Sequence, residues 1–440
     1  MKIALFVLIL LVVLALLGLV HRWLWVRLVR DTTRPGGPAR RIGTALAFAL
    51  PLLSLAALTS GRAGAPFRLQ QAVAWPGYLW LAVLLYLSLA MLLAEPVRAV
   101  LLRRPAPSRP AREAAPGPEP RLREGAASGT ARRGPGVDLS EPVPPPVVSL
   151  APPAAAPDRA AQDPEGVSRR QFVARAVGGV AAGAALGTVG YGTYGVLRGP
   201  GVKRVRVPLA KLPRAAHGFR IAVVSDIHLS PVLGRAHTTR IVDTVNRTQP
   251  DLIAIVGDLV DGNVHDLGNA AEPLSRLRAR HGSYFVTGNH EYFSGAQQWI
   301  DHVRELGLVP LENARRALPH FDLAGVNDVQ GESEGHGPDF DAALGDRDRA
   351  RAAVLLAHQP VVIHDAVRHG VDLQLSGHTH GGQLWPGNYL AELANPTVAG
   401  LERYGDTQLY VSRGAGAWGP PVRVGAPSDI TVVQLASYQA

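Results

Sequence analysis

The sequence has 440 residues, of which 47% are hydrophobic and none is cysteine, and its formal net charge is +10. The absence of cysteine excludes disulfide bonds and thiolate metal ligands, so any metal site must use nitrogen and oxygen donors. The length allows two or three domains with a large core in at least one of them.

Three apolar runs near the N-terminus are long enough to cross a lipid bilayer. They cover residues 3–20, 42–58 and 78–94, with aromatic or charged residues at their flanks. None shows the polar face at a 3.6-residue period that is typical of helices in a water-soluble bundle. We therefore predict a three-span transmembrane module over residues 1–102, with a buried helical bundle as the alternative.

The distribution of arginine predicts how these spans are oriented. The connection between the first two runs carries six arginines and one aspartate, whereas the next connection carries only Arg62 and Arg68. Because positively charged loops stay in the cytoplasm, the first connection should be cytoplasmic and the N-terminus outside. Much of the net positive charge is thereby explained by membrane orientation rather than by an acidic partner.

Residues 103–167 are rich in proline, alanine, glycine and arginine and lack a sustained apolar period. This composition predicts a disordered linker. Its charges are mixed, whereas nucleic-acid-binding tails carry blocks of one sign, so no nucleic-acid partner is expected.

The segment 168–200 begins with Ser168-Arg169-Arg170-Gln171-Phe172 and continues as a Gly- and Ala-rich apolar stretch. The pattern resembles a twin-arginine export signal, which would make the twin-arginine translocation machinery a partner. The alternative is an arbitrary arginine pair before a fourth span. Both interpretations place the chain after Leu197 outside, and the lack of a small-x-small cleavage site favours a retained anchor. We expect a multi-pass protein of the cytoplasmic membrane whose C-terminal domain faces the extracytoplasmic side.

From residue 201 to 440, short apolar runs alternate with helical patterns, which indicates a mixed α/β domain with buried strands. Acidic, amide or histidine side chains follow five of these runs, where open α/β sheets place their sites. The predicted strands are residues 219–224, 252–256, 283–287, 352–357 and 371–375, with a helix over 238–247.

The side chains after these strands form a set of nitrogen and oxygen donors. Seven such donors are enough for two divalent ions that share one carboxylate. Two ions about 3.5 to 4 Å apart can hold a bridging hydroxide and clamp the oxygens of a phosphate during in-line displacement. Each donor alone could be a helix cap, a turn residue or a core histidine, but their shared position at strand ends favours a metal centre. The donors are Asp226, His228, Asp258, Asn289, His358, His378 and His380.

The donors lie within five motifs that follow one another along the chain. They are Asp226-x-His228, Gly257-Asp258-x-x-Asp261, Gly288-Asn289-His290-Glu291, His358 and Gly377-His378-x-His380. This set resembles the calcineurin-like metallophosphoesterases over about residues 202–435. The runs Gly381-Gly382-Gln383 and Ser412-Arg413-Gly414-Ala415-Gly416 are most similar to the bacterial YkuE/YaeI-like branch, which includes membrane-associated phosphoesterases, some acting on UDP-diacylglucosamine.

The resemblance implies an α/β fold, a four-layer αββα sandwich of two mixed sheets flanked by helices, over residues 201–440. It implies that two metal ions share Asp258. The first ion would also bind Asp226, His228 and His380, and the second Asn289, His358 and His378. His290 would protonate or stabilise the leaving oxygen, and Asp261 would orient its imidazole. Manganese is the expected metal because it suits nitrogen and oxygen donors, with zinc and iron as alternatives.

The expected function is hydrolysis of a phosphodiester, pyrophosphate or phosphomonoester by a metal-bound hydroxide. The nearby membrane segment favours a lipid-linked or envelope substrate. The alternative is a non-catalytic membrane sensor that binds metal or phosphate, which the unusual N-terminal module motivates. The intact His290 and Asp261 argue against a sensor, because a binding module needs no proton donor.

Other polar residues are expected to have ordinary roles. Residues 322–348 are expected to form a polar loop insertion over the sheet, with a substrate lid as the alternative. Arginines able to bind phosphate bidentately are Arg235, Arg413 and Arg423, with none preferred. Histidines outside the motifs are expected at the surface, namely His237, His265, His281, His302, His320, His336, His364 and His369.

Overall fold

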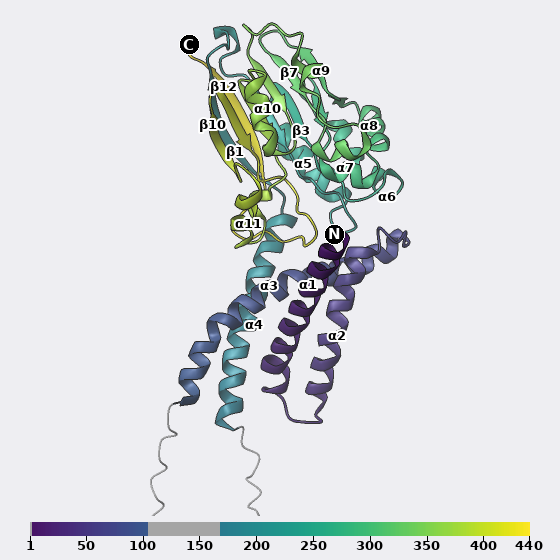
Figure 1. The fold of residues 1–440 in the computed structure, drawn as a ribbon, viewed down its shortest axis with the longest axis vertical. Helices are drawn as coiled ribbons and strands as arrows, with labels where there is room; N and C mark the ends of the chain where they lie inside the picture. The colour runs from purple at the N-terminus through teal and green to yellow at the C-terminus, as the bar shows by residue number, and fades with distance from the viewer. Residues whose placement is uncertain (1, 104–167) are drawn as a thin grey trace, which may run out of the picture.

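The computed structural model describes residues 2–103 and 168–440. Long helices form one end of the elongated molecule and a C-terminal α/β domain forms the other (Figure 1). The predicted linker, residues 103–167, lies outside the described residues except for Arg103. The long helices are α1 (Lys2–Trp25), α2 (Pro38–Thr59), α3 (Phe67–Arg103) and α4 (Arg169–Leu197). All four are long and apolar enough to cross a membrane.

Helix α3 packs against both α2 and α4. The approach of α2 to α3 is close at Gly77, where the Ser54 hydroxyl donates a hydrogen bond of 2.8 Å to the Gly77 carbonyl. Small residues allow such close backbone contact between apolar helices. At the far end of the helices, the Asp31 carboxylate lies 3.2 Å from both Arg27 and Arg98, and these ion pairs tie α3 to the end of α1.

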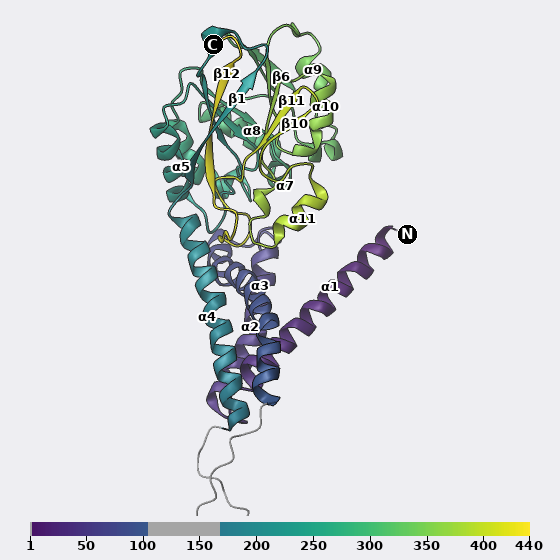
Figure 2. The same ribbon diagram turned by 90° about the vertical axis from the view of Figure 1, so that its left-hand side faces the viewer.

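The N-terminus and the connection between α2 and α3 lie at the end of the helices next to the C-terminal domain (Figures 1 and 2). The arginine-rich connection between α1 and α2 lies at the opposite end, with the end of α3 and the start of α4. The four long helices therefore alternate in direction.

The C-terminal domain contains two mixed six-stranded sheets, with strand orders β1-β12-β2-β3-β4-β5 and β10-β11-β9-β8-β7-β6. The strands of the first sheet are β1 (Gly201–Leu209), β2 (Arg220–Val224), β3 (Leu252–Val256), β4 (Ser283–Val286), β5 (Val309–Pro310) and β12 (Asp429–Ser437). Those of the second are β6 (Ala314–Ala317), β7 (Asp322–Gly325), β8 (Ala353–Leu356), β9 (Leu373–Ser376), β10 (Gly400–Tyr404) and β11 (Thr407–Val411). Strands β2 to β5 run parallel, as do β7, β8, β9 and β11.

The two sheets pack face to face, and helices cover their outer faces. In β2, Ile221 and Val223 join the core between the sheets, whereas Ala222 and Val224 pack against the helix layer. This alternation follows from the two-residue period of a strand and explains why both faces are apolar. The first sheet is covered by α5 (Arg235–Arg247), α6 (Val264–Ala271) and α8 (Ala296–Glu305), and the second by α9 (Phe340–Leu344) and α10 (Ile363–Arg368). The predicted four-layer sandwich is confirmed.

Each of the five predicted strands overlaps an observed strand, and α5 begins at Arg235, before the predicted start at Thr238. The prediction of a polar loop over residues 322–348 is wrong at its start. Residues Asp322–Gly325 form β7, a buried strand inside the second sheet, and α9 lies further along the segment. Strand β7 is short and holds both an aspartate and a glycine, so its sequence lacks the apolar run typical of a buried strand.

Candidate metal centre

All seven predicted donors meet at the carboxyl edge of the two sheets. Strands β2, β3 and β4 of the first sheet lead into Asp226, His228, Asp258 and Asn289. Strands β8 and β9 of the second sheet lead into His358, His378 and His380. Because parallel strands end at the same edge, residues distant in sequence converge there.

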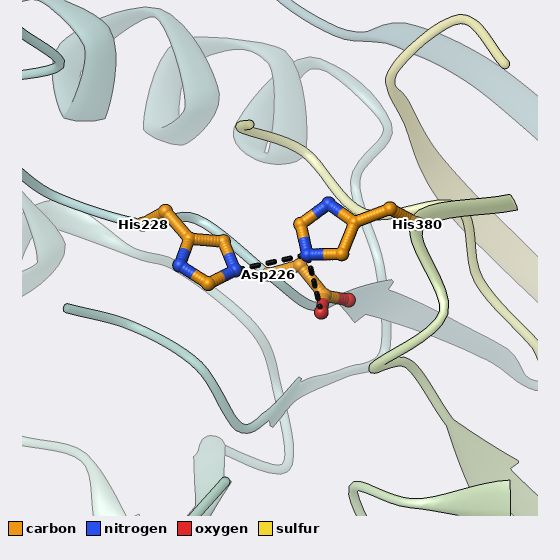
Figure 3. Close-up of side chains that lie close together, drawn as sticks. All are labelled: Asp226, His228 and His380. Atoms are coloured by element: carbon orange, nitrogen blue, oxygen red, sulfur yellow. Dashed lines mark hydrogen bonds and ion pairs between the residues drawn. The ribbon is translucent and has the colours of Figure 1, made fainter. Parts of the chain in front are cut away.

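The first group of donors consists of Asp226, His228 and His380 (Figure 3). The Nε2 atoms of His228 and His380 lie 3.0 Å apart, and Nε2 of His380 lies 3.3 Å from Oδ1 of Asp226. All three residues are buried. Two nitrogens bound at right angles to one ion would be about 3 Å apart, so this spacing fits two ligands of one octahedral ion.

The second group contains Asp258, His358 and His378, with Asn289 beside them. Oδ2 of Asp258 lies 3.1 Å from Nε2 of His358 and 3.7 Å from Nε2 of His228. Nδ1 of His378 lies 3.0 Å from Oδ1 of Asn289. Asp258 therefore lies between the two groups, as a shared ligand requires.

The hydrogen bonds of the Nδ1 atoms of His358 and His228 show whether their Nε2 atoms are free to bind a cation. Nδ1 of His358 lies 2.9 Å from the carbonyl oxygen of Val256, which can only accept, so this nitrogen carries the proton. In neutral His358, Nε2 then presents a lone pair to Asp258, and it has no hydrogen-bond partner among the described residues. His228 has the same arrangement, because its Nδ1 lies 2.9 Å from Oδ1 of Asp261.

Without a cation, these two imidazoles are held protonated by their neighbours. Burial lowers the pKa of His228, but Asp261 and the other nearby carboxylates outweigh burial and raise it to about 9. For His358, burial likewise lowers the pKa, and Asp258 raises it well above its usual value. A divalent ion would take the place of these protons, so the donor set fits bound metal.

Burial shifts the pKa values of the remaining donors. It raises the pKa of Asp226, whereas His358 outweighs burial at Asp258 and holds the pKa of that carboxyl well below its usual range. Burial lowers the pKa of His378 to about 4 and that of His380 well below its usual value. Both histidines are therefore neutral at physiological pH, the form that binds a metal.

The backbone is strained at the donors. In the described part of the chain, eight non-glycine residues have positive φ, and five of them belong to the donor set. L-residues adopt this left-handed region at a cost of about 1 to 3 kcal/mol each, and such strain is concentrated at functional sites. The five φ values are 53° at Asp226, 50° at His228, 51° at Asp258, 73° at His378 and 53° at His380.

The glycine of the last motif allows the two sheets to meet. A Cβ atom at Gly377 would clash with the side chains of Ser225 and Asp226. The next residue, His378, donates its backbone N–H to Oδ1 of Asp226 at 3.0 Å. The segment after β9 is thereby fixed against the segment after β2, which brings His380 to His228.

The predicted proton donor, His290, lies on the more accessible side of the seven metal-ligand candidates. Nδ1 of His290 lies 2.6 Å from Oδ1 of Asp261, the oxygen that also faces His228. Nε2 of His290 points toward Asp258, 4.0 Å from its Oδ2. Burial raises the pKa of Asp261, but His228 and His290 outweigh it and lower that pKa below its usual value. Asp261 is therefore ionised, and its carboxylate is positioned to orient the imidazole of His290.

Sequence reasoning did not assign a role to Glu291, although it is part of a motif. Its buried carboxylate accepts backbone hydrogen bonds from Asp258, Leu259 and Gly288, at 3.0, 2.7 and 2.6 Å. It thereby holds the segment after β3 against the start of helix α7 (Asn289–Ser294). The position of glutamate directly after Asn289-His290 is the only signal for this role in the sequence.

The three arginines considered for phosphate binding differ in position. Arg423 is buried, and its guanidinium donates to Nδ1 of His380 at 3.0 Å and to the carbonyl oxygens of His380, Gly416 and Ala426. It supports a donor residue and is not free to bind phosphate. Arg235 is exposed on α5 and pairs with Glu272. Arg413 lies next to the metal-binding loop, within 3.1 Å of where a Cβ on Gly381 would be.

The aromatic residues Phe293 and Trp418 flank His290, with ring centroids 5.6 and 5.8 Å from the imidazole. The backbone of Trp418 is joined to the side chain of Gln383 by hydrogen bonds of 2.8 and 2.9 Å. Sequence reasoning missed both aromatic residues because they lie outside the motifs, and only the structure brings them together.

Comparisons with known proteins agree with this fold. Residues 219–382 match the family model described as calcineurin-like phosphoesterase. A transmembrane protein with a metallophosphoesterase domain from Danio rerio is 40% identical over 259 residues, 56% of this chain and 59% of the relative. A metallophosphoesterase of Helicobacter pylori strain J99 is 38% identical over 255 residues, 57% of this chain and 68% of the relative.

The metallophosphoesterase YkuE of Bacillus subtilis is 30% identical over 285 residues. This match covers 62% of the present chain and 98% of YkuE. The chain thus matches nearly all of YkuE but only about three fifths of the Danio rerio relative. The chain belongs to the calcineurin-like metallophosphoesterase family.

Proposed function

We propose that this chain is a membrane-anchored, two-metal-dependent phosphoesterase. The observation that carries the proposal is the convergence of seven nitrogen and oxygen donors around the shared carboxylate of Asp258, with His290 at their accessible side. A structural histidine cluster would need no strained backbone at five of its residues and no accessible imidazole oriented by a separate carboxylate.

Asp226, His228 and His380 would hold one divalent ion, Asn289, His358 and His378 the other, and Asp258 would bind both. Such ions supply Lewis-acid polarisation of the phosphoryl oxygens and an activated water. We propose manganese as the metal because the donors are imidazole, carboxylate and amide, with zinc and iron as alternatives.

The residues of the chain itself provide the proton transfer. His290 is positioned to donate a proton from Nε2 to the leaving oxygen, because its other nitrogen is already bonded to Asp261. The same Asp261 oxygen orients His228, so one carboxylate aligns a metal ligand and the proton donor. The rings of Phe293 and Trp418 flank the His290 imidazole.

The proposed organisation of the chain is a transmembrane module over residues 1–102, a linker over 103–167, a twin-arginine-like segment or fourth span over 168–200 and the metallophosphoesterase domain over 201–440. The side chain of Ser168 caps α4 by accepting the backbone N–H of Gln171, so the helix begins at the arginine pair. The packing of α4 on α3 supports a segment that remains attached to the domain rather than one that is removed.

We propose that the catalytic domain faces the extracytoplasmic side of the cytoplasmic membrane. A reporter that is active only in the periplasm, fused after Ala440, should be active, and one that fluoresces only in the cytoplasm should be dark. The opposite pair of results would overturn this orientation.

The proposed substrates are phosphodiesters, pyrophosphates or phosphomonoesters that are lipid-linked or part of the cell envelope. The test is hydrolysis by the full-length protein in detergent, with manganese, of lipid-linked, nucleotide and protein phosphates and of a generic aryl phosphodiester. Manganese-dependent turnover of at least one phosphoester is expected. Binding of phosphate compounds without turnover of any would overturn the proposal and favour a membrane sensor.

A further inference from the structure

Six large apolar or aromatic side chains are exposed on the side of the catalytic domain next to the long helices, and together they are called the apolar rim. Phe293 and Trp418 lie beside His290, and Trp418 is 56% exposed. Large exposed apolar patches on soluble domains mark surfaces that bind a partner or a membrane. The apolar rim consists of Phe293, Trp385, Tyr389, Leu390, Leu393 and Trp418.

Half of the apolar rim lies on one short helix, α11 (Gly387–Ala394), in which no residue is buried. Tyr389, Leu390 and Leu393 are spaced so that they share one face of this helix, and Leu390 and Leu393 are 71% and 85% exposed. The domain core therefore does not account for these side chains. The helix begins seven positions after His380, so it is continuous with the metal-binding loop.

The segment that leads into α11 is fastened to two long helices, at the middle of α3 and near the C-terminal end of α4. The hydroxyl of Tyr86 on α3 donates to the carbonyl oxygen of Trp385 at 3.0 Å. On α4, the carbonyl oxygen of Gly192 accepts the backbone N–H of Arg423 at 3.3 Å. The next residue, Val424, exchanges backbone hydrogen bonds with the Gln383–Trp385 segment.

Residues typical of the headgroup region of a bilayer lie at the α4 side of this attachment. On α4, Gly192 lies next to Tyr191 and Tyr194, which are both exposed, and the Arg198 guanidinium lies 5.8 Å from the Tyr194 ring. Tyrosine and arginine at the end of an apolar helix are typical of the membrane interface. The base of α11 is thus held next to the end of α4 that carries these tyrosine and arginine residues.

The metal centre faces the same way as α11. Phe67, the first residue of α3, packs against the core cluster that contains Leu259 and Val260, which directly follow Asp258. Figures 1 and 2 both show α11 on the underside of the domain, next to the long helices. The carboxyl edge of the sheets is therefore turned toward the membrane helices.

We propose that the apolar rim inserts into the interfacial layer of the membrane that α1 to α4 cross, so that the metal centre opens at the level of the lipid headgroups. An amphipathic helix with leucine and tyrosine on one face binds in this layer. The bilayer is the partner because the apolar rim adjoins the bundle that the bilayer surrounds. This inference rests on the proposed membrane anchoring. If it holds, a phosphoester can reach His290 while its apolar part stays in the bilayer.

The absence of native cysteine allows a direct test with the full-length protein. Single-cysteine variants Leu390→Cys and Leu393→Cys, labelled with an environment-sensitive fluorophore, are placed in phosphatidylcholine and phosphatidylglycerol nanodiscs. Lipids with a nitroxide quencher near the headgroup are then added to the disc composition. The control is Asp406→Cys, because the side chain of Asp406 is fully exposed. Asp406 lines a pocket together with Asp372, which directly precedes β9, so it lies at the edge of the sheet opposite the metal centre.

Quenching at positions 390 and 393, together with unquenched emission at 406, is the expected result. Unquenched emission at 390 and 393 that resembles emission in water would overturn the inference. Blue-shifted emission without quenching would also overturn it, because it would mean that another protein or a second copy of this chain covers α11. Both leucines are exposed, so neither substitution removes a core contact, and a manganese-dependent thermal shift checks that each variant is folded. The readout does not require turnover, so failure of the proposed phosphoesterase activity would be seen separately.

Discussion

The Nε2 atoms of His228 and His380 lie 3.0 Å apart, although the two residues are 152 positions apart in the sequence. Nδ1 of His228 is already bonded to Asp261, so its Nε2 presents a lone pair to the second imidazole when the ring is neutral. Because Nδ1 of His380 accepts from Arg423, the proton of neutral His380 lies on Nε2, and a shared cation would take the place of this proton between the two imidazoles. The stability of the domain should therefore depend on bound metal.

Removal of metal by a chelator should lower the melting temperature of the full-length protein, and manganese should restore it. Manganese at about 100 times its dissociation constant stabilises the folded state by about 2.7 kcal/mol, which corresponds to a rise of roughly 5 to 10 °C. The buried Trp299 provides a fluorescence signal for unfolding of the domain. A melting temperature that changes with neither chelator nor manganese would contradict the metal assignment. In the Asp258→Asn variant, the melting temperature is expected not to respond to manganese.

His290→Asn should lower kcat by about 100- to 10,000-fold, because the proton donor for the leaving oxygen is lost. Metal content measured by elemental analysis should remain that of the unchanged protein, since His290 is outside the proposed ligand set. The control is His265→Asn, at an exposed histidine on α6. Equal kcat in the His290→Asn and control variants would exclude the proposed role.

Asp261→Asn should reduce activity or metal affinity by about 10- to 100-fold, as is typical when a carboxylate behind a metal-binding histidine is lost. The physical reason is that a single oxygen of Asp261 faces both His228 and His290. At saturating manganese, which compensates for weaker binding at His228, the kcat of the combined variant Asp261→Asn/His290→Asn should be little below that of His290→Asn alone, because both residues act on one proton transfer. Fully additive losses in kcat would indicate that Asp261 does not act through His290.

The stability of the domain should fall at acidic pH in part because of His237. This side chain is 1% exposed, and neither ring nitrogen has a hydrogen-bond partner in the described part of the chain. Burial, with a smaller effect of Arg240, lowers the pKa of His237 to about 3. Its contribution is therefore complete above the unfolded value of 6.5 and is lost as pH falls from 6.5 toward 3.

Between pH 6.5 and 5, the loss attributable to His237 should approach about 1.4 kcal/mol per pH unit. His237→Leu should remove this component, whereas His265→Leu, at an exposed position, should not. The measurement is the melting temperature of each full-length variant across this pH range at constant manganese. An identical pH dependence in the unchanged protein and His237→Leu would refute the assignment.

Local sequence patterns predicted the donors because each donor directly follows an apolar strand. Asp226 and Asp258, which follow two parallel strands of the first sheet, could be placed at one edge of that sheet from strand direction alone. The positions of Arg423 and Trp418 could not be predicted, because Arg423 reaches His380 across 43 residues and Trp418 reaches His290 from another part of the chain. Contacts of this kind depend on tertiary packing.

Two predictions failed for the same reason. His237 was expected at the surface, but it is buried on α5, and Arg423, distant in sequence, is among the charges that act on it. Residues Asp322–Gly325 were expected in a polar loop, but they lie between β6 and β8 as β7. In both cases a polar side chain was expected to be exposed although it lies in a buried element. His237 shares the buried face of α5 with Ile241 and Val245, and Asp322 begins the short strand β7, which neighbouring strands cover.

Two divalent ions that share Asp258 are proposed to make this protein a phosphoesterase. The most direct measurement is a titration of metal-free full-length protein with manganese while hydrolysis of an aryl phosphodiester is followed, in parallel with the Asp258→Asn variant. We predict that turnover of the unchanged protein rises with bound manganese and reaches its maximum at two ions per chain, whereas Asp258→Asn stays near background. Turnover that is complete without metal, or that survives in Asp258→Asn, would contradict the account.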